Sequence, residues 1–107
     1  MIRVRISLTM PKGCTVHESL MEAAPGWRDL LGPYKQGLIS DAEYTRCYRA
    51  LLEANKDRIL EAFDAIVARH PDEDIVLLCW CKKGAFCHRR LLAQWLEEQG
   101  RGPIPEL

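Results

Sequence analysis

Two stretches of the chain have the hydrophobic pattern of β-strands. Residues 1–8 alternate apolar and polar side chains, which is typical of a strand with one buried face. Residues 75–78 form a continuous apolar run after a turn-like Pro-Asp-Glu-Asp, as expected for a strand buried on both faces. Helical segments separate the two, so a right-handed crossover between them predicts a parallel sheet.

The region between these strands has the spacing of amphipathic helices. Ser40 and Glu43 match a capping box, and the apolar positions that follow predict one helix, a break or kink at residues 55–57, and a second helix that ends at His70-Pro71. We expect the apolar stripes of both helices to lie in the core. They comprise Tyr44, Cys47, Tyr48, Leu51, Leu52, Ile59, Phe63, Ile66 and Val67.

Three further segments are predicted from shorter patterns. Thr15 and Glu18 resemble another capping box and predict a short helix to about Ala24. Residues 25–37 are interpreted as a packed connector with one helical turn at residues 27–31. Apolar residues at helical spacing after residue 88 predict a last helix that stops near residue 99, because Gly100 follows.

The order of elements predicts one small α/β domain over residues 1–107, with a short, mainly parallel sheet flanked by helices and a tail at residues 101–107. Two strands are few for a free-standing sheet. A third strand could come from residues 14–27 or from the tail. The alternative is a homodimer, in which a second chain covers a sheet edge.

Charge and composition indicate where in the cell the protein is expected and which partners it is expected to bind. Fifteen basic and fifteen acidic residues give zero net charge, which argues against broad electrostatic binding to nucleic acid or a membrane but permits a local basic patch. The first residues have no apolar run of the secretory type, and no stretch approaches the roughly 20 apolar residues that span a bilayer. We therefore expect a cytoplasmic protein whose five cysteines are not a disulfide framework.

The candidate catalytic and ligand-binding residues lie between the second predicted strand and the last predicted helix. Open α/β sheets bind their ligands at such carboxyl ends of strands. Thiol, imidazole and cationic side chains lie close together there: Cys79, Cys81, Lys82, Lys83, Cys87, His88, Arg89 and Arg90.

An anionic ligand is one interpretation of this cluster. His88, Arg89 and Arg90 stand at the positive end of the helix dipole, and Glu97 and Glu98 at its negative end, each at a cost of about 0.3–1 kcal/mol. A phosphate or carboxylate beside the arginines, Lys82 and Lys83 would offset this cost. The alternative is that the arginines contact an acidic partner, or Glu73 and Asp74.

A zinc site is the second interpretation. Cys79, Cys81, Cys87 and His88 are ligand types of tetrahedral zinc, although the C-x-C spacing differs from the usual C-x2-C pairs. A third interpretation takes the cysteines as inert core residues, because a buried thiol behaves as a small apolar side chain.

The sequence from Leu77 to Lys82, followed by Cys87-His88-Arg89, resembles the domain of unknown function 488 family. In that family a strand ends in a cysteine and a C-H-R triplet opens the last helix. Upstream, Tyr34 to Ser40 with Glu43-Tyr44 is similar to the family's region before its long helices, so the resemblance covers roughly residues 24–100. It implies an α/β fold and a site at the cysteines, but no established reaction.

Two departures from the family pattern affect the site. Cys81 stands where the family usually has a glutamate, and the amino-terminal part is shorter and lacks the family's usual second strand. A thiol can replace a carboxylate as a metal ligand but not as a general base of similar pKa.

The leading hypothesis is a small enzyme or binding protein for an anionic, phosphate- or nucleotide-like compound or a nucleic-acid end. In it Cys87, His88 and Cys79 are catalytic, with Cys87 a thiolate and His88 an acid or base. Arg89, Lys82, Lys83 and Arg90 bind the ligand. The alternative is a non-catalytic interaction module that zinc stabilises through Cys79, Cys81, Cys87 and His88.

Overall fold

The fold is organised around a three-stranded parallel sheet. The computed structural model describes residues 1–6, 13–24, 32–78 and 88–105. In these ranges β1 (Ile2–Arg5) lies between β2 (Glu18–Ser19) and β3 (Ile75–Leu78). The predicted small α/β domain with a parallel sheet is confirmed, and the third strand comes from the region of residues 14–27.

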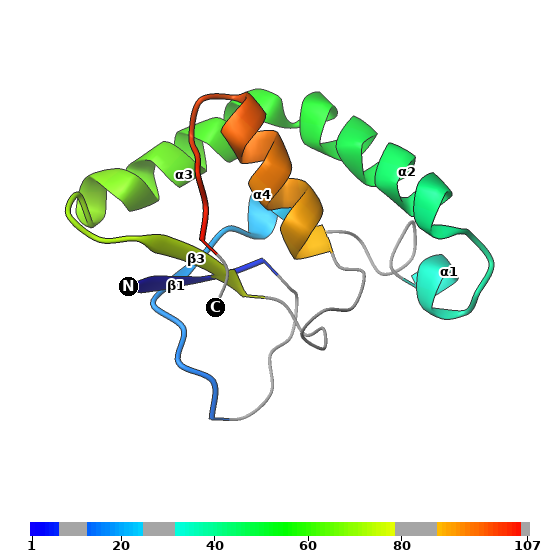
Figure 1. Cartoon of the computed structure of the whole chain (residues 1–107), viewed down its shortest axis with the longest axis horizontal. Helices are drawn as coiled ribbons and strands as arrows, with labels where there is room; N and C mark the ends of the chain where they lie inside the picture. Colours follow the sequence, from blue (N-terminus) through cyan, green and yellow to red (C-terminus); the bar gives the residue numbers. More distant parts are fainter. Residues whose placement is uncertain (7–12, 25–31, 79–87, 106–107) are drawn as a thin grey trace.

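The helices form an arch over one side of this sheet. α2 (Asp41–Ala54) and α3 (Lys56–Arg69) follow each other with only Asn55 between them, which confirms the predicted break. α4 (His88–Glu98) lies between this arch and the strands (Figure 1). Two short elements, the 3-10 turn η1 (Met21–Ala23) and α1 (Gly32–Lys35), precede the arch.

A single hydrophobic core joins the helices to one face of the sheet. Alternate residues of β1 and β3 enter it, because successive side chains of a strand point to opposite faces. The buried stripes of α2, α3 and α4 cover these residues. The strands contribute Ile2, Val4, Ile6, Ile75 and Leu77, and the helices contribute Tyr44, Tyr48, Leu52, Ile59, Phe63, Ile66, Leu91, Leu92, Trp95 and Leu96. The predicted core positions Tyr44 and Tyr48 are confirmed.

The helix ends follow the local signals in the sequence. The Ser40 hydroxyl accepts a hydrogen bond from the Glu43 amide at 3.2 Å, so Ser40 caps α2 as predicted. At the end of α4, Gly100 has a φ of +80°, and the amides of Gly100 and Arg101 donate to the carbonyls of Glu97 and Leu96. This is a Schellman motif, in which glycine adopts the left-handed conformation without steric cost.

The predicted helix from residue 15 to residue 24 is wrong. Glu18–Ser19 form β2, and η1 is the only helical turn in that region. The amides of His17 and Leu20 donate to the carbonyls of Arg3 and Arg5 at 2.9 and 2.8 Å. Pairing with β1 therefore satisfies the backbone groups that a helix would have satisfied locally.

Three other expectations need correction. Val67 was expected in the core but is 38% exposed on α3, because Ile59, Phe63 and Ile66 form the buried stripe of that helix. Cys47 is exposed, because α2 buries a narrow stripe of Tyr44, Tyr48 and Leu52, and Cys47 lies beside it. Gly32-Pro33 was expected to lie in a connector but forms the start of α1, where proline is tolerated because first-turn amides have no helical partner. The helical turn expected at residues 27–31 lies outside the described residues.

The chain after α4 returns to the core. Arg101 binds the Asp64 carboxylate of α3 through two nitrogens, at 3.1 and 2.9 Å, and Ile104 packs against the core. Part of the predicted tail is thus held by α3. In the described part of the chain no helix is long and apolar enough to cross a bilayer.

The edge strand β2 is held to α3 by a carboxylate. Glu18 accepts hydrogen bonds from Arg69 Nε and Nη2 at 3.0 and 2.8 Å, and its Oε2 lies 2.8 Å from Nε2 of His70. Hydrogen bonds from Arg69 and then from His70 lower the pKa of Glu18 from 4.5 to about 2. Sequence analysis placed His70 at a helix end, and its partner there is this carboxylate.

We expect the Glu18 contacts to make stability sensitive to acid. Because the pKa of Glu18 is lowered on folding, its stabilising contribution is complete above the ordinary value of 4.5 and is lost as the pH falls through about 2. Urea denaturation of Glu18→Gln over this range should show a weaker loss of stability with acid than the wild type. Glu22→Gln, which alters an exposed carboxylate on η1, is the control and should retain the wild-type slope. Equal slopes for wild type and Glu18→Gln would contradict the assignment.

Candidate functional site

The residues on either side of the segment that carries the candidate cysteines both contact Ile6, the residue that follows β1. The Ile6 amide donates to the Leu78 carbonyl at 3.0 Å, just before Cys79. The Ile6 carbonyl lies 3.1 Å from Nε2 of His88, just after Cys87. Residue 6 therefore joins both ends of the segment 79–87. Cys79, Cys81, Lys82, Lys83 and Cys87 themselves lie outside the described residues.

This position coincides with the point where the direction of the strand order reverses. In the order β2-β1-β3, the chain passes from the central strand β1 to β2 on one side, and the later connection runs from β2 to β3 on the other side of β1. Open α/β sheets bind ligands in the crevice beyond the carboxyl ends of the two strands at such a switch point. The amino end of α4 lies at this end of β1 and β3 (Figure 1). We call this region the β1/β3 edge, defined by Arg5, Ile6, Leu78 and His88.

His88 is a buried side chain with a defined tautomer. It is 3% exposed, and its imidazole packs edge-on against the Tyr48 ring at a centroid distance of 5.7 Å. Because the Ile6 carbonyl can only accept, Nε2 must carry a proton and donate to it. In the neutral ring the lone pair is therefore on Nδ1, which is the nitrogen suited to accept a proton or to bind a metal.

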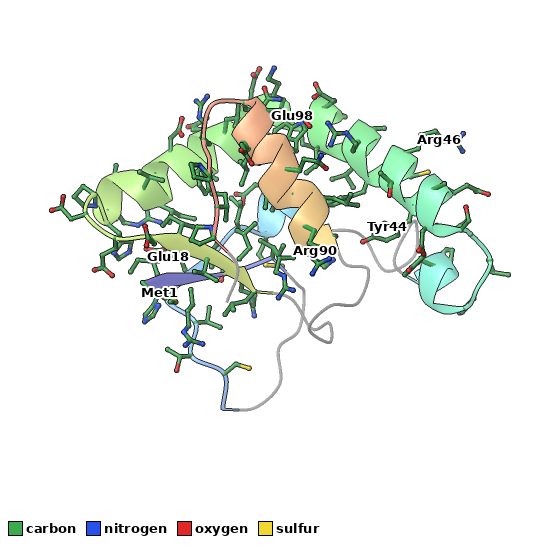
Figure 2. The ribbon with its side chains drawn as sticks, viewed as in Figure 1. Met1, Glu18, Tyr44, Arg46, Arg90 and Glu98 are labelled. Carbon is green, nitrogen blue, oxygen red and sulfur yellow. The ribbon has the colours of Figure 1, made fainter. Side chains whose placement is uncertain are left out.

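A row of tyrosines extends from His88 towards α1. Ring centroids lie 6.0 Å apart for Tyr48 and Tyr44, and 4.8 Å apart for Tyr44 and Tyr34. Tyr44 extends from α2 towards the beginning of α4 (Figure 2). The Tyr48 hydroxyl donates to the buried Ala23 carbonyl at 2.6 Å, and burial raises the pKa of this phenol well above its ordinary value. Tyr48 is thus a neutral hydrogen-bond donor, and its ring packs beside the His88 imidazole.

The first turn of α4 presents two arginines at the β1/β3 edge. Arg89 is half-buried and Arg90 is exposed. Figure 2 shows Arg90 at the beginning of α4. The helix amides here carry partial positive charge, so the location favours an anion. Sequence analysis placed both arginines at the helix start, and the structure confirms that placement.

The acidic carboxyl end of α4 is stabilised by an ion pair with another helix. Glu98 pairs with Arg49 of α2, which offsets the unfavourable placement of a carboxylate at a helix carboxyl end. Glu73, the acidic residue suggested as a partner for the arginines, instead contacts the Met1 ammonium at 3.0 Å. Since Met1 and Glu73 precede β1 and β3, that ion pair lies at the other end of the sheet.

The described residues contain no group of three or more His, Cys, Asp or Glu side chains that could hold a metal ion. Three of the four predicted zinc ligands are outside that set, so the zinc hypothesis remains a prediction. Cys14 and Cys47 are exposed free thiols on other parts of the surface.

Sequence reasoning missed the contributions of Ile6 and Tyr48 to the site. Ile6 contributes through its backbone, and Tyr48 through a ring contact between distant elements. Neither contribution has a local signal in the sequence, because both partners of each contact are far apart along the chain.

Comparison with known proteins identifies the family of this chain. The family model DUF488-N3a, described as the active DUF488-N3 subclade, matches residues 2–100. No curated protein and no solved structure gives a significant match. The match includes β1 and therefore extends beyond the residues that carried the resemblance.

Proposed function

Because the chain belongs to the domain of unknown function 488 family, in its active N3 subclade, we propose that its function resides at the β1/β3 edge, where it binds an anionic, phosphate- or nucleotide-like ligand. The observation that carries this proposal is the double contact of Ile6, which joins the end of β3 to the start of α4 at the switch point. Leu78 and His88, which flank the segment 79–87, are thereby held at the place where such sheets bind ligands.

Each candidate residue has a distinct role in this proposal. Arg89 clamps the anion through paired N–H donors, and Arg90, Lys82 and Lys83 add positive charge. Cys87, which directly precedes α4 in the sequence, is the thiolate, and Cys79 assists it. His88 holds or transfers a proton at Nδ1, because its Nε2 donates to the Ile6 carbonyl.

Removing the Arg89 guanidinium should weaken ligand binding without unfolding the domain. A hydrogen bond to a charged group contributes about 1.5–3 kcal/mol, so Arg89→Ala should reduce affinity about 10- to 100-fold. Calorimetric titration with inorganic phosphate and with a nucleoside monophosphate measures this change.

Arg46→Ala is the matched control, because it removes the same charge from the exposed surface of α2, away from the β1/β3 edge (Figure 2). This control should bind like the wild type. Equal affinities for Arg89→Ala and the wild type would remove Arg89 as the clamp. A wild type that binds neither probe would contradict the anion site itself.

One observation supports a second candidate function, the zinc-stabilised interaction module. Metal-bound histidines commonly donate their other ring N–H to a backbone carbonyl, and His88 donates Nε2–H to Ile6. In this alternative Nδ1 of His88 binds zinc together with Cys79, Cys81 and Cys87, and the metal supplies folding energy.

The metal content of the protein distinguishes the anion site from the zinc-stabilised interaction module. Elemental mass spectrometry of untagged protein, with the melting temperature recorded before and after chelation, is the measurement. The zinc module predicts about one zinc per chain, a large fall in melting temperature on chelation, and loss of zinc in Cys87→Ser. The anion site predicts protein without stoichiometric zinc and a melting temperature that a chelator does not change.

A further inference from the structure

Arg5 lies at the β1/β3 edge although no motif includes it. It is the last residue of β1, and its backbone is in register with Leu78 of β3 and Ser19 of β2. Its neighbours Val4 and Ile6 point into the core, so the Arg5 side chain starts from the other face of the sheet. It is half-buried, and its Nε atom is buried.

Among the described residues, no carboxylate supplies a counter-charge to the Arg5 guanidinium. In the described ranges nothing hydrogen-bonds Nε of Arg5, and no carboxylate pairs with its side chain. Three other arginines have such partners: Arg49 pairs with Glu98, Arg69 with Glu18, and Arg101 with Asp64. A buried donor without an acceptor is costly, and the cost is greater when the donor carries a charge. An anion that binds beside Arg5 would remove this cost.

We propose that Arg5 is a second ligand-binding arginine of the β1/β3 edge and that the ligand is a phosphate monoester. This inference rests on the proposed anion site. Open α/β sheets bind ligands beyond the carboxyl ends of their strands, where both faces of the sheet end, so a long side chain from either face can contact such a ligand.

Two guanidinium groups at one site favour a phosphate over a carboxylate as the ligand. One arginine can occupy both oxygens of a carboxylate in a bidentate pair. Arg5 comes from β1 and Arg89 from α4, so the ligand must offer oxygens in two directions. A terminal phosphate has three oxygens and about two negative charges, and it suits two arginines better than a carboxylate does.

The test is a phosphate titration of Arg5→Gln, Arg5→Lys and Arg3→Gln, with acetate as the carboxylate comparison. Arg3 is the matched control, because it is half-buried on the same strand and the same face, two residues before Arg5. We expect inorganic phosphate to bind the wild type more tightly than acetate. Arg5→Gln should lose about tenfold or more in phosphate affinity, and Arg5→Lys should lose less, because lysine keeps the charge but not the paired donors. Arg3→Gln should change little.

A second measurement does not depend on the stability of any variant. In the wild type, the NMR signal of the Arg5 Nε–H group should shift as inorganic phosphate is added, because phosphate would accept its hydrogen bond. An unchanged Arg5 signal, or full phosphate affinity in Arg5→Gln while Arg89→Ala is impaired, would overturn the role of Arg5 and leave the anion site in place. Equal binding of acetate and phosphate would overturn the phosphate assignment. Failure of the wild type to bind phosphate would overturn the proposed function and this inference together.

Discussion

Trp95→Ala is expected to lower the free energy of unfolding by about 3–5 kcal/mol, the range for truncating a buried aromatic side chain to alanine. Trp95 is fully buried in the core, and its indole N–H donates to the Glu53 carboxylate at 2.8 Å. It therefore joins α4 to α2 through both apolar contact and a hydrogen bond. Urea denaturation followed by far-UV circular dichroism measures the loss.

Trp95→Phe separates the two contributions. Phenylalanine retains most of the apolar contact and removes the hydrogen bond, whose net contribution is about 1 kcal/mol. Glu53 is exposed, so water can solvate its carboxylate when the indole is absent. We expect the phenylalanine variant to lose about a third of what the alanine variant loses. Similar losses for both variants would mean that the hydrogen bond, and not burial, dominates.

His88→Ala is expected to lower the free energy of unfolding by about 2–4 kcal/mol. The substitution leaves the buried Ile6 carbonyl without its donor, which costs about 1–3 kcal/mol, and it removes the ring contact with Tyr48. Since His88 connects α4 to β1, the attachment of the segment 79–87 should weaken as well. Thermal unfolding and amide hydrogen exchange of β1 measure these effects.

His88→Gln tests whether the Nε2 bond is responsible. A glutamine amide can donate from about the same position as Nε2 of histidine, so this variant should recover part of the stability lost in His88→Ala. It lacks a nitrogen equivalent to Nδ1, so any proton transfer or metal binding at Nδ1 should remain lost. If both variants are equally destabilised, the ring contact with Tyr48, and not the hydrogen bond, provides the stabilisation.

Local signals in the sequence predicted much of the helical part of the fold. Ser40 and Glu43 are three residues apart, so the cap of α2 depends only on neighbouring residues. Gly100 likewise ends α4 through hydrogen bonds within five residues. The strand at residues 75–78 was recognisable because a continuous apolar run is typical of a strand buried on both faces.

The structural predictions from sequence were wrong where contacts with distant elements outweighed a local sequence pattern. Thr15 and Glu18 have the spacing of a capping box, but the Glu18 carboxylate binds Arg69, the last residue of α3, and His70, which follows it. Cys47 has the spacing of a core residue, but the stripe that α2 buries is narrower than its apolar pattern. Local spacing carries no information about which distant element covers a side chain.

By itself, the sequence determined the start of α2, the end of α4 and the candidate segment from Cys79 to Arg90, because each depends on residues that are close together along the chain. The order of the predicted elements indicated the parallel α/β class. Only the tertiary structure decided that Ile6 joins both ends of that segment, that Nε2 of His88 is the protonated nitrogen, and that Arg5 lies at the same edge. The physical reason is that strand order, long-range hydrogen bonds and burial arise when elements far apart in the chain pack against one another. The candidate residues are close together in one segment of the sequence, whereas the fold was needed to show that Leu78 and His88, on either side of residues 79–87, both contact Ile6.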